Sequence, residues 1–423
     1  MSSISWKGGA AAVAQVQTYA FAGTWEATDV VRCVIGNKTV SFVGGSTTIT
    51  TAIDTIVTAW LALDASVYPE FAEITPSRSS TTLTLTAVTA GKPFTCTITP
   101  LETGGGAADA QTIEGAGTAT TGTAATASSG PEDVSTAANW SAGAIPVNTD
   151  TVTVDLEGAR LKYGLDQNGI TLTALNITAK DVEIGLPVTN ADAAEYPEYR
   201  ATSWKISATT VYTNTKSGRL KLNFGTAQTA YTQDASGTGR ETNIPPVLLQ
   251  GTHASNVWNF FGGQAGLAFF AGDTFTATTL RLDDGATVFA GSACAIATAN
   301  NFGGTLTMRC AASTALNHPG TGRAITRVEG SGAVAQVTLQ GGQLFYNTTG
   351  TLGGNTVLGG TASMSFDEDQ QVKTVTNPIL IYSPSVQFSD AFASITGGYT
   401  LHFVNCIGTI KLKPNSSIVV AAL

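Results

Sequence analysis

The chain of 423 residues is poor in charge, because Asp, Glu, Lys and Arg together make up only 12% of it, about half the usual share. Acidic side chains outnumber basic ones, 30 to 21, for a net charge of −9, and no block of Lys or Arg occurs. We therefore predict no nucleic-acid partner, since binding to phosphates needs clustered positive charge. Runs of eighteen apolar residues are also missing, so no membrane-spanning segment is expected.

The first residues, MSSISWKGGAAAVAQVQTYAF, lack the basic stretch and continuous apolar core of a signal peptide. We therefore expect a protein that is made and assembled in a reducing cytoplasm. The five cysteines are far apart and have no CxxC spacing, so we interpret them as buried small apolar side chains. They are Cys33, Cys96, Cys294, Cys310 and Cys406.

Motifs of common catalytic and cofactor sites are also missing, including GxSxG, HExxH, the P-loop and the dinucleotide fingerprint. The three histidines, His253, His318 and His402, have no paired or helical spacing. We predict each of them to be a turn or lateral surface residue rather than a metal ligand. The sequence thus predicts no catalytic residue, no cofactor and no metal site.

Glycine is abundant, with 46 residues, and in the C-terminal half a glycine turn precedes a short alternating apolar stretch about every nineteen residues. A period near 19 is too short for helical repeats or propeller blades, and the alternation is that of strands. We predict a single-chain parallel β-helix with about 14 turns, roughly 65–70 Å long at about 4.8 Å per turn. The glycines that open the stretches are Gly263, Gly285, Gly304, Gly322, Gly342 and Gly360.

Residues 1–101 differ from the rest of the chain because expected strands flank one expected helix. They are predicted to form a small α+β domain for attachment or oligomerisation. Apolar residues at helical spacing predict a helix over 51–64. A hairpin over 30–43 precedes it, with Gly36-Asn37 at its turn. Further strands are expected at 71–75, 82–88 and 94–99, so that one helix packs on an antiparallel sheet.

Residues 102–130 contain almost no large apolar side chain, so we expect a Gly/Ala/Thr-rich linker or a loosely attached edge strand. The β-helix is predicted over 131–423, with an N-terminal cap at 131–150 that covers its apolar layer and its unpaired edge. Polar, Pro-containing segments at 189–202 and 226–246 are expected to be loop excursions. Strands are expected at 170–178, 181–188, 203–214, 219–225 and 247–251.

The cap and the repeats together resemble virion proteins predicted in tailed bacteriophages, over most of the chain. The matching stretches are TAGKPFT (89–95), SSGPEDVSTAANWSAGAIPVNTDTVTVD (128–155), LKYGLDQNGITLTALNI (161–177), IGLPV (184–188), YPEYRAT (196–202), LLQGTHASNVWN (248–259) and LAFFAGDTFTATTLRL (267–282). The resemblance implies a structural protein of the virion, without saying which part of the particle it occupies.

Within the virion we expect a capsid decoration or cement protein, a homotrimer that contacts the major capsid protein. The chain is compact and has no long coiled-coil or collagen-like shaft. The alternative is a tail fibre or tailspike that binds host-surface glycan. A secreted bacterial adhesin is a further alternative, which the expected lack of a signal peptide opposes.

A polysaccharide-degrading β-helix enzyme is another alternative, and it would need two or three acids on one lateral face at glycosidase separations. The candidates are Asp283-Asp284, the run Asp367-Glu368-Asp369, and the loop residues Glu195 and Glu198. Asp284 precedes the turn glycine Gly285, where Asp is favoured for its backbone hydrogen bonds. We interpret these acids as turn and loop residues and predict a non-enzyme.

Aromatic residues form two clusters. Trp258, Phe260, Phe261, Phe269 and Phe270 are predicted to stack inside the β-helix. The second cluster lies in a loop excursion that also carries Arg200, and protruding Tyr and Arg are typical of interface hot spots. Its candidate partner-contact residues are Tyr196, Glu198, Tyr199, Arg200 and Trp204; simple packing of the loop on its own chain is the alternative.

Overall fold

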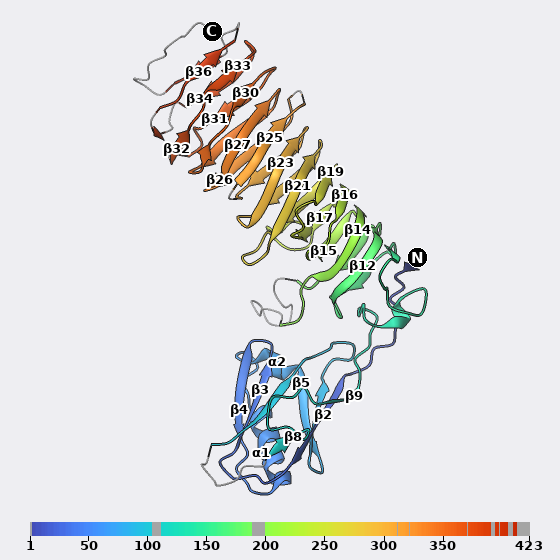
Figure 1. The fold of residues 1–423 in the computed structure, drawn as a ribbon. Helices are drawn as coiled ribbons and strands as arrows, with labels where there is room; N and C mark the ends of the chain where they lie inside the picture. The colour runs from blue at the N-terminus through green and yellow to red at the C-terminus, as the bar shows by residue number, and fades with distance from the viewer. Residues whose placement is uncertain are drawn as a thin grey trace.

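The computed structural model describes residues 2–103, 111–187, 199–310, 312–320, 322–369, 371–390, 394–396, 398–404 and 409–412. Strands account for 50% of the residues and helices for 5%. The predicted fold class is confirmed, because the chain forms a parallel β-solenoid of about 11 turns together with a small antiparallel domain (Figure 1).

The small domain holds two antiparallel sheets and one full helix. Strand order is β5-β6-β2 in one sheet, with β8 and β9 also paired to β2, and β4-β3-β7 in the other. The elements are β2 (Val16–Ala22), β3 (Val30–Ile35), β4 (Lys38–Val43), α1 (Ile49–Leu61), α2 (Pro69–Ala72), β5 (Ile74–Ser79), β6 (Thr82–Ala87), β7 (Thr97–Leu101), β8 (Thr112–Ile113) and β9 (Thr123–Thr126).

Helix α1 contacts both sheets through one apolar face, as its spacing predicts. Ile53, Ile56 and Trp60 on this face are buried. The Trp60 ring stacks on Phe42 at 5.6 Å between centroids and meets Phe71 at 4.8 Å. These aromatic contacts fix the helix between β4 and α2, since large rings supply most of the apolar area that such a small core can bury.

The segment expected to be a linker contributes two edge strands in its described part, 111–130. Both β8 and β9 pair antiparallel with β2, and the Ile113 side chain is fully buried in the domain core. For these residues the alternative of an edge strand is confirmed and that of a linker is not.

The N-terminus does not lie in the small domain but in the solenoid. Strand β1 (Ser3–Ser5) pairs parallel with β10 (Thr151–Val154), the first strand of the regular stack. Beside it, Trp6 packs edge-on against Trp140 at 4.9 Å between ring centroids. The boundary predicted at residue 1 is therefore corrected: residues 13–129 form an inserted domain, joined to the solenoid by two chain segments (Figure 1).

Side chains of the cap hold the two connecting segments together. The Asn139 amide donates to the carbonyl oxygens of Gly130 and Asp133, and its oxygen accepts from the Ala10 amide at 2.8 Å. Asn139 ends the short 3-10 helix η1 (Ala137–Asn139) and is fully buried. One amide therefore satisfies backbone groups from both segments where the inserted domain begins and ends.

The solenoid consists of strands that pair parallel with their counterparts in the next turn. One stack comprises β10, β12 (Asp166–Ile177), β14 (Trp204–Asn214), β16 (Ala230–Ala235), β19 (Val257–Phe260), β21 (Phe275–Leu282), β23 (Cys294–Asn301), β25 (Ala312–His318) and β27 (Ala333–Leu339). It divides after β27 into β29 (Thr351–Leu352), β32 (Val372–Val375) and β35 (Ser394–Thr396), and β30 (Thr356–Leu358), β33 (Ile379–Ile381) and β36 (Leu401–Phe403).

The second stack runs beside the first along the whole rod. It comprises β11 (Ala159–Leu161), β13 (Asp181–Ile184), β15 (Ser217–Asn223), β17 (Thr238–Gly239), β18 (Val247–Gln250), β20 (Gly263–Leu267), β22 (Ala286–Ala290), β24 (Thr305–Met308), β26 (Ile325–Gly330), β28 (Gln343–Thr348), β31 (Ser363–Ser365), β34 (Gln387–Ser389) and β37 (Thr409–Lys411). The predicted glycine series precedes or begins the strands of this stack from β20 to β31.

The turn count of about 11 corrects the predicted 14. The regular part keeps the expected period, with Thr279 paired to Thr298. Near the cap the period is longer, because Ala174 pairs with Thr210 and Ala230 with Val257 across loop excursions. At about 4.8 Å per turn, the rod is about 50 Å long.

Aromatic side chains fill the solenoid between residues 224 and 275, as predicted in part. Trp258 and Phe260 are fully buried, and Trp258 lies 4.5 Å from Phe275 and 5.3 Å from Tyr231 between ring centroids. The prediction is wrong for Phe261, which is 39% exposed, and for Phe269 and Phe270, which are only partly buried and lie outside the core. Phe261 follows the inward-facing Phe260 by one residue, so the strand alternation turns it outward.

Candidate functional site

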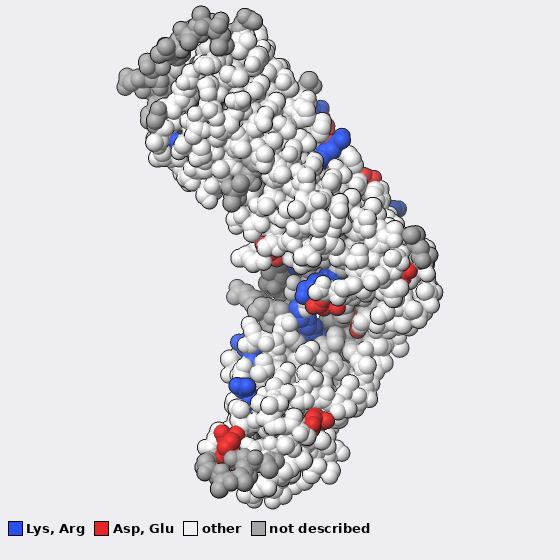
Figure 2. Space-filling view, in the orientation of Figure 1, with Lys and Arg blue, Asp and Glu red and all other residues white. Residues whose placement is uncertain are grey.

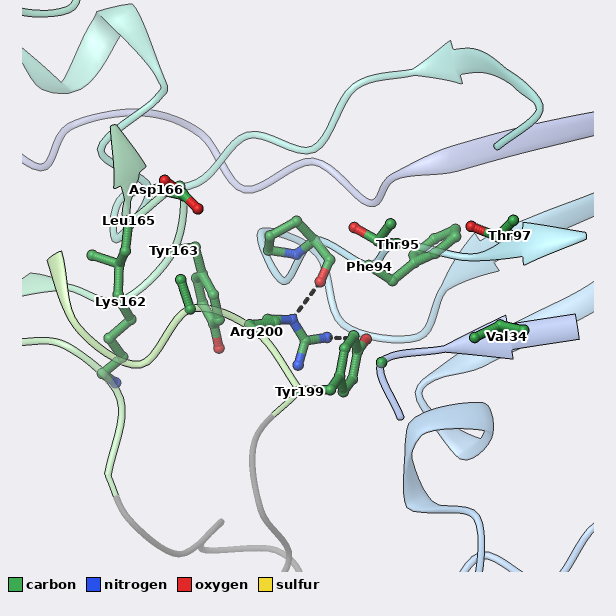
Figure 3. Close-up of a pocket in the computed structure, with 14 residues that line it drawn as sticks. Val34, Phe94, Thr95, Thr97, Lys162, Tyr163, Leu165, Asp166, Tyr199 and Arg200 are labelled. Carbon is green, nitrogen blue, oxygen red and sulfur yellow. Dashed lines mark hydrogen bonds between the residues drawn. The ribbon is translucent and has the colours of Figure 1, made fainter. Parts of the chain in front are cut away.

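A pocket of about 470 Å³ lies between the inserted domain and the first turns of the solenoid (Figure 3). The domain side is formed around Phe94 and Thr95, and the solenoid side around Tyr163 and Leu165. Tyr199 and Arg200, which return from the predicted loop excursion, extend between the two sides. The pocket therefore marks the junction of the two parts of the molecule.

Arg200 is the centre of this junction. Its Nη2 donates to Glu73 Oε2 at 2.5 Å, and its Nε donates to the Pro93 carbonyl oxygen at 2.5 Å. The guanidinium carbon lies 4.2 Å from the centroid of the Tyr199 ring, within cation–π range. Arg200 thus joins two separate segments of the inserted domain to the solenoid.

Glu73 completes the group by binding two cations at once. Its Oε1 pairs with Lys92 Nζ while its Oε2 pairs with Arg200, and its side chain is only 17% exposed. Ion pairs with so little exposed surface depend on each partner, because removing one leaves an uncompensated charge in a poorly hydrated place. We call Glu73, Lys92, Tyr199 and Arg200 the junction clamp.

The hairpin turn of the inserted domain allows Tyr199 to approach closely. Gly36 has φ +59°, and a Cβ built there would lie 2.4 Å from Tyr199 Cβ. Both the left-handed backbone and the lack of a side chain are therefore required at this position. The Gly36-Asn37 turn, predicted as an ordinary hairpin feature, is also a docking surface for the solenoid loop.

The candidate partner-contact residues separate into three groups. Tyr196 and Glu198 lie outside the described residues. Tyr199 and Arg200 contact the inserted domain of their own chain, as the alternative of loop packing states, and contact with a second chain stays a prediction. Trp204 has no exposed surface; it lies in the solenoid core and donates from Nε1 to Gln167 Oε1 at 2.9 Å.

Charged side chains gather around this junction, whereas most of the visible solenoid face is uncharged (Figure 2). On the solenoid side Lys162 pairs with Glu132 at 3.3 Å, and Lys205 with Asp166 at 2.9 Å. The hydrogen bond from Lys205 lowers the pKa of Asp166 below its ordinary value. The charges at the junction are thus matched in pairs, which suits a structural contact better than the capture of a charged ligand.

The five described acids considered for glycoside cleavage each have another partner. Asp283 pairs with Arg281 at 2.9 Å, and Asp284 with Arg323 at 2.8 Å. In the later run, Asp367 accepts from Ser389, Glu368 pairs with Arg327 and Asp369 with Lys373. Glu195 and Glu198 lie outside the described residues. These contacts fit the interpretation of the described acids as turn and loop residues.

Two further predictions concern histidine and metals. His318 was expected at the surface, but it is fully buried, with Nε2 2.8 Å from Thr326 Oγ1 and Nδ1 3.3 Å from the Gly341 carbonyl oxygen. Burial lowers its pKa to about 4. Among the described residues, no group of three or more His, Cys, Asp or Glu side chains is placed to hold a metal ion.

The cysteines of the described residues are free and buried, in agreement with their interpretation as small apolar side chains: Cys33, Cys96, Cys294 and Cys310. Cys406 lies outside the described residues.

A second concave site, larger than the junction pocket, lies on the outer face of the second stack. It has a volume of about 770 Å³ and runs between the segment 238–245 and strands β20, β22 and β24. The sequence predicts a loop excursion at 226–246, but this is wrong for residues 230–235, which form β16 of the first stack. The sequence analysis does not predict the site, whose floor includes Phe289, 36% exposed. The outward position of Phe289 in the alternating β22 was the available signal.

The fold and the junction define a class: a parallel β-solenoid with an antiparallel domain inserted after its first strand and clamped to its first turns. No protein family, curated protein or solved structure matches the chain. No helix in the described part of the chain has the length and hydrophobicity to cross a membrane.

Proposed function

We propose that the protein is a structural component of the surface of a tailed-bacteriophage particle, with the inserted domain as its attachment part and the solenoid as a rigid outer part. The observation that carries the proposal is the junction, where two chain segments and the junction clamp join the domain to the solenoid. A rod held at one angle to its base suits a lattice that repeats the same contact many times.

Within the particle, a capsid decoration or cement protein is the role that we favour, as a homotrimer on the major capsid protein. The resemblance in the cap and the repeats supports the virion assignment. The paired charges and the stacked strands support a part that resists unfolding and proteolysis, because nearly every backbone group of a stacked strand is bonded to the next turn.

Quantitative mass spectrometry of purified particles tests this role. A decoration protein is expected at a copy number on the order of hundreds per particle, since it follows the symmetry of the capsid. The major capsid protein serves as the internal standard. A copy number on the order of ten would instead place the protein in the tail.

The second candidate is a tail fibre or tailspike that binds host-surface glycan. One observation favours it, the concave site below the segment 238–245, which combines an exposed aromatic ring with amide and hydroxyl side chains. Its ligand can be tested without knowing the position of the protein in the particle.

A further inference from the structure

The concave site on the second stack, called the lateral groove, is formed by Asn243, Gln264, Phe269, Phe289, Thr307 and Arg309. Its floor is the outer face of three consecutive strands, in which Gly266, Phe289 and Thr307 stand in register. The segment 238–245 forms the wall. The groove therefore crosses the strands of several turns and has the size of a ligand site.

The floor presents a flat apolar surface. The Phe289 ring is 36% exposed, and Phe269 lies beside it in the groove. Its neighbour in the preceding turn is Gly266, where an added Cβ would lie 2.9 Å from both Phe269 and Leu248. The glycine therefore leaves room for Phe269 and Leu248 to pack over this strand, which places Phe269 at the edge of the groove.

The sides of the groove present hydrogen-bonding groups that the protein itself leaves unused. The side chains of Asn243, Gln264 and Thr307 make no hydrogen bond within the described part of the chain. An amide offers both donors and an acceptor, and a hydroxyl offers one donor and two lone pairs. These three side chains are therefore suited to a ligand that donates and accepts hydrogen bonds at closely spaced positions.

The charged groups of the groove are already balanced. Arg309 Nε pairs with Glu329 at 2.9 Å, and Glu241 at the wall pairs with Arg219 at 3.0 Å. An anionic ligand would have to compete with these carboxylates for the guanidinium groups. The charge balance thus favours a neutral ligand.

The wall is anchored, so the groove exists before a ligand arrives. Arg240 binds both carboxylate oxygens of Asp181, at 2.7 and 2.8 Å, and it also contacts Glu183. Arg219, only 8% exposed, joins Glu241 to the same group. A preformed site loses little conformational entropy when it binds.

We propose that the lateral groove binds a neutral oligosaccharide. The apolar C–H face of one sugar ring would lie on Phe289, and its hydroxyl groups would exchange hydrogen bonds with Asn243, Gln264 and Thr307. An apolar peptide would leave these amides without partners, which costs affinity. Nucleic acid would require unpaired positive charge, which the Arg309–Glu329 pair does not offer.

The experiment is a glycan array of neutral and acidic bacterial surface oligosaccharides, probed with the full chain and followed by titration of the best neutral binder. Phe289→Ala and Gln264→Ala are each expected to weaken binding by about tenfold. The matched control is Phe302→Ala, because Phe302 is a similarly exposed phenylalanine, at 41%, that packs on Arg281 and does not line the groove.

Thermal unfolding of each variant separates loss of binding from loss of folding. The proposal is overturned if no neutral oligosaccharide binds, if only acidic ones bind, or if Phe302→Ala weakens binding as much as Phe289→Ala. The result is independent of the copy number in the particle, so the lateral groove and the capsid role can fail separately.

Discussion

Arg200 and Trp204 are four residues apart, and the sequence predicts a partner contact for both, yet they contact different parts of the molecule. Arg200 contacts the inserted domain, and Trp204 begins β14 with its ring in the solenoid core. The sequence contained the distinction, because Trp204 alternates with Ile206 and Ala208, which are also buried. The Arg200–Glu73 pair was not predictable, since the two residues are separated by 127 positions.

His318 could not be placed inside from the sequence either. It continues the inward column of β25 after Leu316, where strand alternation alone would expect an apolar residue. What makes the position tolerable is Thr326 on the following strand β26, whose hydroxyl bonds to the ring, together with the Gly341 carbonyl oxygen of the next turn. A polar residue in a core needs such a partner, and the identity of the partner depends on the register of the turns.

The buried histidine predicts a stability that falls in acid. Its pKa is about 4 in the folded chain and about 6.5 when unfolded, so the unfolded chain takes up the proton first as the pH falls. The contribution of His318 to the free energy of unfolding is fully present above pH ~6.5. It declines by about 3 kcal/mol as the pH falls towards 4. Denaturant unfolding between pH 7 and 4 measures it.

His318→Gln should be less stable at pH 7 but should lose this part of the pH dependence, because an amide does not titrate. His253→Gln, in a surface turn, is the control and should keep the slope of the original chain. An unchanged slope in His318→Gln would show that other groups cause the loss in acid.

At the scale of elements, the glycine period predicted the second stack well and the number of turns poorly. Gly285 and Gly342 have φ values of +87° and +74° just before β22 and β28, so the turn chemistry that the period indicates is present. The period says nothing about excursions between strands. The two long register steps near the cap therefore reduced the count to about 11 turns.

The hairpin turn between β3 and β4 gives a prediction for one element. Gly36→Ala should destabilise the inserted domain by about 3 kcal/mol. The alanine backbone must adopt φ +59°, and the new Cβ also displaces Tyr199. Gly115→Ala is matched to it, with φ +72° in the same domain but open space around the added Cβ. It should cost only about 1 kcal/mol; equal losses in thermal unfolding would mean that the Tyr199 contact adds nothing.

For the whole molecule, we expect the junction clamp to fix the angle between the inserted domain and the solenoid. Glu73→Gln removes the charge that Lys92 and Arg200 share, and it should weaken docking of the domain by about 2 kcal/mol. We expect a larger radius of gyration in small-angle X-ray scattering and faster hydrogen exchange near residues 92–95. The two chain segments keep the parts connected, so both should remain folded.

The control for this variant is an ion pair of the same domain away from the junction. Asp54 and Arg78 pair at 2.7 Å with side chains 55% and 31% exposed, and exposed pairs contribute about 0–1 kcal/mol. Asp54→Asn should leave the scattering curve unchanged. A Glu73→Gln curve that matches it would show that the two connecting segments alone fix the angle.

The largest difference between expectation and structure at this scale is the position of the N-terminus. A strand of three residues such as β1 is too short to show an alternating pattern in the sequence. Trp6 is followed by Lys, Gly and Ala residues, which do not indicate a buried core position. Only its partners, β10 and Trp140, show that it belongs to the cap.

The pairing of β1 with β10 has a consequence for assembly of the chain. The two strands are separated by about 148 positions, and closing so long a flexible loop is costly in entropy. In the folded inserted domain, however, Val13 bonds to Ser129, so the ends of that loop are already together. The folded domain thus shortens the loop that must close before β1 can pair with β10, and we expect this pairing to follow the folding of the inserted domain.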